Sequence, residues 1–172
     1  MRPPRRSRLD GDFTITRGIT IPPGDYEFRD TSFGFDASAK RLLYGRVRAG
    51  WGDFYNGNRK YLQISPAFKP LPQFSLEPSY ELNKIKLPQG VFNTHLLSMR
   101  LNLNFSNRWL TSMVSQYDSE TKRQVVFLRL NYIYRPGDDL FVVFNQSRER
   151  VSGLGHRLDR TALVKWTRSF DF

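Results

Sequence analysis

The last eleven residues, Ala162 to Phe172, read ALVKWTRSFDF. Every second residue from Ala162 onward is apolar, except Arg168, and the segment ends on an aromatic side chain. Such an alternation predicts a β-strand whose two faces meet different surroundings. A strand in the wall of a lipid-embedded barrel has faces of this kind, because its outer side contacts hydrocarbon and its inner side contacts water. The segment therefore predicts a transmembrane β-barrel strand.

The same alternation recurs along most of the chain. Apolar residues hold every second position in Phe74–Leu82, Leu97–Phe105 and Val126–Tyr134. No window repeats apolar residues at the helical spacing, so we expect an all-β fold. The pattern predicts about nine strands of roughly ten residues, the length that a tilted membrane-spanning strand needs. Their approximate ranges are 25–36, 41–51, 59–68, 73–83, 93–105, 108–117, 122–135, 139–148 and 160–172, with a weaker candidate at 13–16.

Short and long connections alternate between these strands. Short turns, rich in the residues that turns favour, are predicted at 37–40, 69–72, 106–108 and 135–138. Longer loops are predicted at 52–60, 83–91 and 147–159, with a shorter one near 118–122. The alternation is typical of an up-and-down barrel, with tight periplasmic turns and longer extracellular loops. Pro66 and Pro78 fall inside predicted strands, where each would remove a hydrogen bond from the sheet.

The composition excludes a helical membrane protein. Of the 172 residues 39% are hydrophobic, and no run approaches the ~20 apolar residues of a helical span. The absence of cysteine excludes a disulfide framework and a thiolate metal site. The formal net charge of +11 raises the possibility of a polyanionic partner. Because most basic residues recur singly within alternating strands, we interpret them as a solvated or lumenal wall.

The first residues form a basic segment that contains Arg2, Arg5, Arg6 and Arg8. We expect residues 1–11 to be disordered and residues 12–172 to form the barrel. No apolar region follows the basic residues, so the segment does not resemble a signal peptide. An exported barrel requires one, and bacterial barrels favour an even number of strands. We therefore expect the chain to be the C-terminal part of a longer protein.

No arrangement of residues predicts catalysis or metal binding. His95 and His156 are the only histidines and lie far apart in the sequence. Asp138 and Asp139 follow a Pro-Gly pair and are interpreted as turn residues. The segment 153–155 is too short for a phosphate-binding loop and precedes no predicted helix. We predict no enzyme activity, no cofactor and no metal site in this chain.

Polar side chains on the predicted strands form the candidate functional surface. They alternate with the apolar positions, so they would point toward the barrel interior. Such residues either brace a narrow barrel through internal ion pairs or line an aqueous channel, and the sequence leaves both alternatives open. The predicted lumen-facing residues are Arg46, Arg48, Glu77, Arg100, Asn102, Arg129, Asn131 and Lys165.

Five segments share a pattern with a known family: Ile21–Tyr26, Trp51–Gly57, Thr94–Ser98, Tyr132–Val143 and Val164–Phe172. They resemble the C-terminal part of the bacterial outer-membrane family called domain of unknown function 5916. In full-length members, a β-sandwich of the carbohydrate-binding family 9 type precedes a membrane barrel. The resemblance covers residues 12–172 and implies an outer-membrane location, but it transfers no activity and no catalytic residue.

The final strand also resembles the C-terminal signal that the barrel-assembly machinery recognises. Val164, Trp166, Phe170 and Phe172 match that signal, whereas Arg168 departs from it. The resemblance therefore implies that this machinery is a partner.

The expected fold is an antiparallel up-and-down transmembrane β-barrel of about 8–10 strands, or the C-terminal portion of a larger one. The expected role is structural or transport-related, in the outer membrane of a Gram-negative bacterium. Expected partners are outer-membrane lipid, lipopolysaccharide, the barrel-assembly machinery and a missing N-terminal half or larger assembly, with no nucleic acid. The alternative is a soluble basic β-protein that binds nucleic acid or polysaccharide on an exposed sheet. A hydrolase attached to a barrel would need catalytic carboxylates upstream of Met1.

Overall fold

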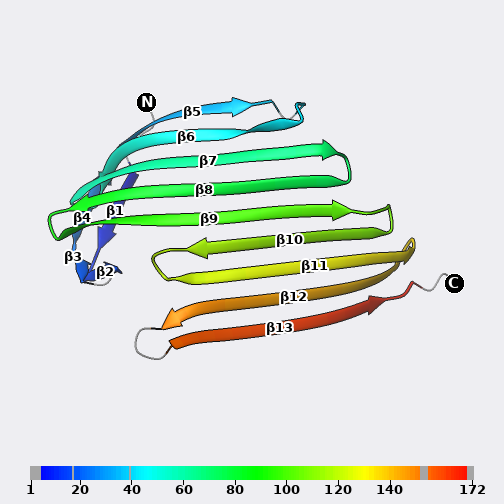
Figure 1. Ribbon diagram of the computed structural model, residues 1–172. Helices are drawn as coiled ribbons and strands as arrows, with labels where there is room; N and C mark the ends of the chain where they lie inside the picture. The colour runs from blue at the N-terminus through cyan, green and yellow to red at the C-terminus, as the bar shows by residue number, and fades with distance from the viewer. Residues whose placement is uncertain (1–4, 17, 39, 152–154, 170–172) are drawn as a thin grey trace.

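The computed structural model describes residues 5–16, 18–38, 40–151 and 155–169, which form thirteen strands (Figure 1). Strands β5 to β13 make one antiparallel sheet in which each strand pairs with its neighbours in sequence. The expected all-β, up-and-down fold is confirmed. No helix in the described ranges is long and apolar enough to cross a membrane. The strands are β5 (Asp30–Ala37), β6 (Leu43–Phe54), β7 (Gly57–Leu71), β8 (Phe74–Leu87), β9 (Gly90–Asn104), β10 (Trp109–Asp118), β11 (Arg123–Arg135), β12 (Asp138–Val151) and β13 (Gly155–Thr167).

The sheet is open among the described residues. β5 pairs with β6 alone and β13 pairs with β12 alone, so these two strands form its edges. The nine strands therefore make a continuous wall, and the expected closure of the wall into a barrel is not seen in this part of the chain.

The hairpins at one end of the sheet are tighter than expected. Residues 52–60 and 83–91, predicted as long loops, belong to strands joined by two-residue turns at 55–56 and 88–89. The predicted loop 147–159 likewise lies in β12 and β13, apart from residues 152–154, which lie outside the described residues. The backbone ladder continues beyond the last alternating apolar residue, as the pairing of Asn58 with Lys86 illustrates. Alternation in the sequence therefore marks the extent of the apolar surface, and not the ends of the strands.

Pro66 and Pro78 lie inside β7 and β8, and the register of these strands places them opposite each other. The β7–β8 pairing stops at Ile64 and resumes at Phe68 without a shift of register. Two residues that lack a backbone N–H thus share one interruption in the sheet, which accommodates both of them in interior strands.

Residues 5–28 form a small unit, here called the cap. Strand β1 (Arg5–Leu9) pairs with β4 (Gly24–Phe28), and β2 (Phe13–Thr16) pairs with β3 (Ile19–Ile21). The structure thus differs from the expectation of a disordered segment at residues 1–11, of which residues 5–9 form a strand. The predicted strand 25–36 is divided between β4 of the cap and β5 of the sheet.

Most of the buried hydrophobic residues lie at the contact between the cap and β8. Ile19 and Ile21 pack against Ile85 and Leu87 at the end of β8, and Ile21 is completely buried. We call this end of the sheet, where the β6–β7 and β8–β9 turns lie, the cap end. The opposite end, with the β7–β8, β9–β10 and β11–β12 turns, is the far end (Figure 1).

The strand register divides the sheet into two faces, because residues directly opposite in antiparallel strands point to the same side. The apolar face carries Phe33, Phe35, Val47, Trp51, Leu62, Ile64, Leu76, Tyr80, Leu82, Leu97, Met99, Leu101, Leu103, Trp109, Met113, Leu128, Leu130, Tyr132, Leu140, Val142, Phe144, Val164 and Trp166. The polar face carries Asp36, Arg46, Arg48, Gln63, Ser65, Ser75, Glu77, Ser79, Glu81, Ser98, Arg100, Asn102, Ser112, Gln116, Arg129, Asn131, Asn145 and Lys165.

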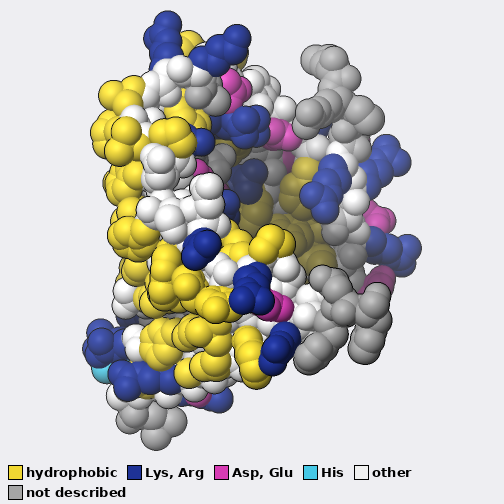
Figure 2. All heavy atoms as spheres, turned by 90° about the vertical axis from the view of Figure 1, so that its right-hand side faces the viewer, with side chains coloured by type: hydrophobic (Ala, Val, Ile, Leu, Met, Phe, Trp, Pro, Cys, Tyr) yellow, Lys and Arg dark blue, Asp and Glu magenta, His cyan; other side chains and the backbone are white. Residues whose placement is uncertain are grey.

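The two faces are separate in space. Figure 2 views the molecule from the far end: hydrophobic side chains cover the left-hand wall, and charged side chains lie in the hollow beside it. Ile85 and Leu87 share the polar side of β8 with Glu81, so the cap packs against the polar face at the cap end.

Candidate functional site: the polar face

All eight predicted lumen-facing residues lie on the polar face. The register connects them across the sheet: Glu77 is opposite Arg100, for example, and Asn131 and Lys165 are both opposite Phe141. The face on which each residue lies follows from the positions of the apolar residues in the same strand, because side chains alternate between the two faces. The sequence alone could therefore predict this face. The residues on this face are Arg46, Arg48, Glu77, Arg100, Asn102, Arg129, Asn131 and Lys165.

A groove of about 690 Å³ extends along the polar face from β5 to β10. It brings together three of the predicted residues, Arg46, Glu77 and Arg100, and also contains Gln63 and Gln116. The remaining predicted residues lie elsewhere on the same face, and Asn102 lines a smaller hollow of about 260 Å³ nearer the far end.

The groove combines ion pairs with neutral hydrogen bonds. Asp36 and Arg46 form an ion pair across β5 and β6, and both side chains are more than half exposed. The Oγ atoms of Ser65 and Ser79 share a hydrogen bond of 2.9 Å beside the proline interruption. The groove thus has one ion pair, which is open to solvent, and one neutral hydrogen bond between neighbouring strands.

The Asn102 side chain is held close to the groove. Its Nδ2 donates a hydrogen bond of 2.9 Å to Oγ of Ser75, which is buried. Asn131, on β11, is also buried, whereas Arg46, Arg48, Arg100 and Arg129 are exposed. The cationic side chains therefore form the accessible part of this surface.

The histidines and the aspartate pair lie outside the polar groove. His95 is on the apolar face, and its Nδ1 shares a hydrogen bond of 2.8 Å with Oη of Tyr80. His156 lies in β13 opposite Arg150. Asp138 follows the β11–β12 turn, and its Oδ1 accepts a hydrogen bond of 2.8 Å from the backbone N of Ser169. Within the described ranges, no three His, Asp or Glu side chains are grouped to hold a metal ion.

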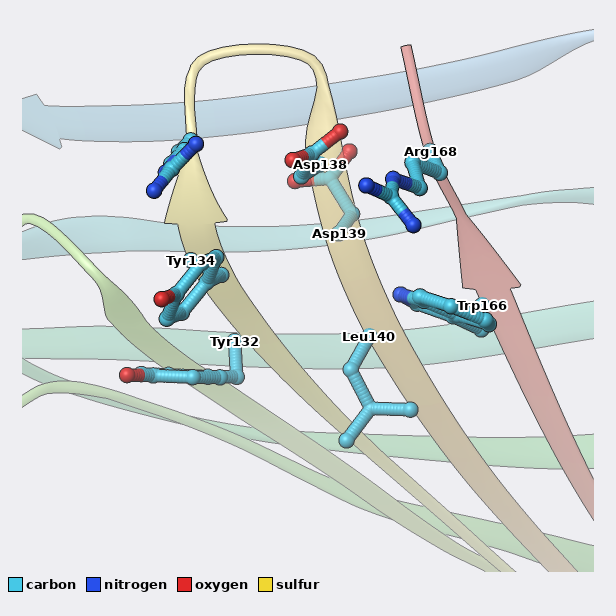
Figure 3. Close-up of a pocket in the computed structure, with 8 residues that line it drawn as sticks. Tyr132, Tyr134, Asp138, Asp139, Leu140, Trp166 and Arg168 are labelled. Carbon is cyan, nitrogen blue, oxygen red and sulfur yellow. The ribbon is translucent and has the colours of Figure 1, made fainter.

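A hollow of about 630 Å³ on the apolar face at the far end has a different chemistry. Tyr132, Leu140 and Trp166 lie side by side on three neighbouring strands, and Asp138 and Arg168 lie beyond them at the strand ends (Figure 3). Tyr132 also contacts Trp109 on the neighbouring strand, and the centroids of the two rings are 4.3 Å apart. Aromatic side chains next to charged ones are typical of the interface between hydrocarbon and water.

The structure describes two of the four predicted assembly-signal residues. Val164 and Trp166 lie on the apolar face of β13, where 67% and 70% of their surface is exposed. Phe170 and Phe172 lie outside the described residues. Recognition of this strand by the barrel-assembly machinery stays a prediction.

Three lysines on the apolar face were not predicted as functional residues. Lys60, Lys84 and Lys86 line a hollow of about 520 Å³ at the cap end. Sequence reasoning missed them because these positions lay at or within predicted loops. The alternation itself could have identified them, because Lys84 and Lys86 occupy every second position after Leu82 and so lie on the same face of β8.

Comparison of the chain with family models, with characterised proteins and with solved structures found no match. The resemblance to domain of unknown function 5916 therefore stays a prediction.

Proposed function

We propose that this sheet is part of the wall of an outer-membrane β-barrel in a Gram-negative bacterium. Its apolar face contacts lipid, and its polar face lines an enclosed aqueous interior. The role of the wall is structural or transport-related, and the groove with Arg46, Glu77 and Arg100 contacts any solute that passes. Lipid, lipopolysaccharide and the barrel-assembly machinery are its partners.

The observation that carries this proposal is the exposure of the apolar face. Five hydrophobic side chains are buried among the described residues, and four of them belong to the contact between the cap and β8. By contrast, Phe33, Phe35, Val164 and Trp166 are each at least 65% exposed. Burying one large apolar side chain stabilises a protein by about 1.5–3 kcal/mol. A sheet that leaves such residues in water on nine strands would forgo most of its hydrophobic stabilisation.

The dimensions of the strands also support a lipid-facing wall. Strands β6 to β13 have 10 to 15 residues, and a tilted spanning strand needs about 9–11. On β9 the uninterrupted apolar positions run from Leu97 to Leu103, about 20 Å at ~3.3 Å per residue. At a strand tilt of about 45° this stretch spans about 14 Å of depth, which fits within the ~25 Å tall apolar band of known barrels.

Tryptophan fluorescence tests the proposal, because all three tryptophans of the chain lie on the apolar face. Trp51, Trp109 and Trp166 are 52%, 41% and 70% exposed. In vesicles of phosphatidylcholine with brominated acyl chains, we expect strong quenching of their emission and little quenching by aqueous iodide.

A matched pair of variants provides the control. In one variant Trp166 is the single remaining tryptophan, and brominated lipid should quench its emission. In the other variant the three native tryptophans are replaced and Lys165→Trp adds a new one, and iodide should quench its emission because residue 165 lies on the opposite face. If both variants respond to iodide alone, and the chain stays in the aqueous fraction with salt-sensitive binding to polyanions, the soluble alternative replaces this proposal.

A further inference from the structure

Three lysines meet on the apolar face at the cap end, and we call them the lysine cluster. Lys60 lies directly opposite Lys84 across β7 and β8, and Lys86 follows on the same face. Trp51 and Val91 also line the groove of about 520 Å³ in which the three lysines lie. All three lysines are exposed.

The protein balances the charges of the lysine cluster in part only. None of the three lysines forms an ion pair within the part of the chain that the structure describes. Asp53 is one carboxylate against four cationic side chains in the lining of the groove, and its Oδ2 accepts a hydrogen bond of 3.1 Å from the backbone N of Arg29. Like charges directly opposite each other destabilise a sheet. The cluster therefore does not contribute to the stability of the sheet by itself, and its net positive charge would attract an anion.

The cluster borders the apolar surface directly. Leu62 and Leu82, opposite each other, are the next residues of β7 and β8 on this face. Lysine side chains can extend along apolar surface while their ammonium groups reach water. A ligand that complements this arrangement has phosphate groups at its head and acyl chains below them.

We propose that the lysine cluster binds the phosphate groups of lipid A, the phosphorylated glycolipid of lipopolysaccharide, whose acyl chains then lie along Leu62 and Leu82. The inference rests on the proposed function and adds an orientation to it, with the cap end in the outer leaflet. Charge supports this orientation, because Arg148 and Arg160 also lie on the apolar face toward the cap end. The border at the far end combines Asp138 with Arg135 and Arg168.

The test measures the dissociation constant of the micelle-solubilised full chain for diphosphoryl lipid A. The variant combines Lys60→Gln, Lys84→Gln and Lys86→Gln, and its control combines Lys40→Gln, Arg41→Gln and Lys69→Gln, which removes the same charge near the far end. We expect the dissociation constant to rise at least tenfold in the cluster variant and less than twofold in the control. Dephosphorylated lipid A should bind the native chain at least tenfold more weakly.

An unchanged dissociation constant in the cluster variant would overturn the inference. So would equal binding of the phosphorylated and dephosphorylated lipids, or displacement of lipid A by inorganic phosphate at concentrations similar to those of the lipid. The brominated-lipid experiment separates the two proposals. If brominated lipid quenches the tryptophans as expected but the cluster variant binds lipid A as tightly as the native chain, the lipid A site is refuted and the membrane wall is not. If brominated lipid does not quench the tryptophans, the membrane wall is refuted.

Discussion

Met99→Arg tests the division of the sheet into a lipid-facing and a water-facing side. Met99 lies on the apolar face of β9 between Leu97 and Leu101. His95, near the cap end of the apolar surface, is four residues away, which is about 13 Å along the strand at ~3.3 Å per residue. With a strand tilt of about 45° this corresponds to a depth of roughly 9 Å, close to the centre of an apolar band about 25 Å tall.

An arginine on the lipid face costs about 2–4 kcal/mol near the centre of the bilayer and about 0–1 kcal/mol near its surface. We expect Met99→Arg to lower the free energy of unfolding by about 2–4 kcal/mol. For an m-value of about 2 kcal/mol/M, the midpoint of urea unfolding falls by about 1–2 M. The assay is equilibrium urea unfolding in phosphatidylcholine vesicles, followed by tryptophan fluorescence.

Two variants complete the test. Ser98→Arg places the same side chain one residue away on the polar face, in the groove and diagonally opposite Glu77 and Glu81, so its expected cost is below about 1 kcal/mol. Tyr117→Arg lies on the apolar face two residues nearer the cap end, directly opposite Leu97, and should cost less than Met99→Arg. Equal losses at residues 98 and 99 would refute the reasoning, because they would show that both faces meet the same medium.

Three further substitutions test the packing. Ile21→Ala should destabilise the cap by about 2–5 kcal/mol, because Ile21 is completely buried, and should speed proteolysis of residues 5–28; unchanged cleavage would contradict the role of the cap contact. Gly50→Ala should lower the thermal midpoint, because an added Cβ would lie 2.6 Å from the backbone oxygen of Thr31 and 2.7 Å from the ring of Tyr61; an unchanged midpoint would show that both neighbours can move away. Arg46→Ala should change the free energy of urea unfolding by less than about 1 kcal/mol, because its ion pair with Asp36 is largely exposed; a larger loss would indicate a buried pair.

The alternation in the sequence predicted eight strands of the sheet and their faces, whereas the predicted strand 25–36 is divided between β4 and β5. Arg100, for example, lies between the apolar residues Met99 and Leu101, so its side chain must point to the opposite face of the strand. The same logic failed at 83–91, where Lys84 and Lys86 leave the apolar band although their backbone remains paired. A pattern of side chains reports the surroundings of a strand, whereas hydrogen bonds between backbones determine its length.

The weaker strand candidate at 13–16 is confirmed as β2, but the cap as a unit could not be predicted because its stability comes from residues distant in sequence. Ile19 and Ile21 become buried against Ile85 and Leu87, and short strands such as β3 have too few residues to show a period. Likewise, the opposition of Pro66 and Pro78 follows from the β7–β8 register, and neither proline identifies the other by its local sequence.

The nearest-neighbour pairing of β5 to β13 also has a consequence for folding. Each hairpin can form as soon as its two strands are adjacent, so the sheet can assemble one strand at a time. The entropic cost of loop closure is small at each step because the connections are short. The contact of Ile19 and Ile21 with β8 closes a loop of more than sixty residues and requires strands up to β8 to be in place. Docking of residues 5–28 should therefore be a late event that follows growth of the first hairpins.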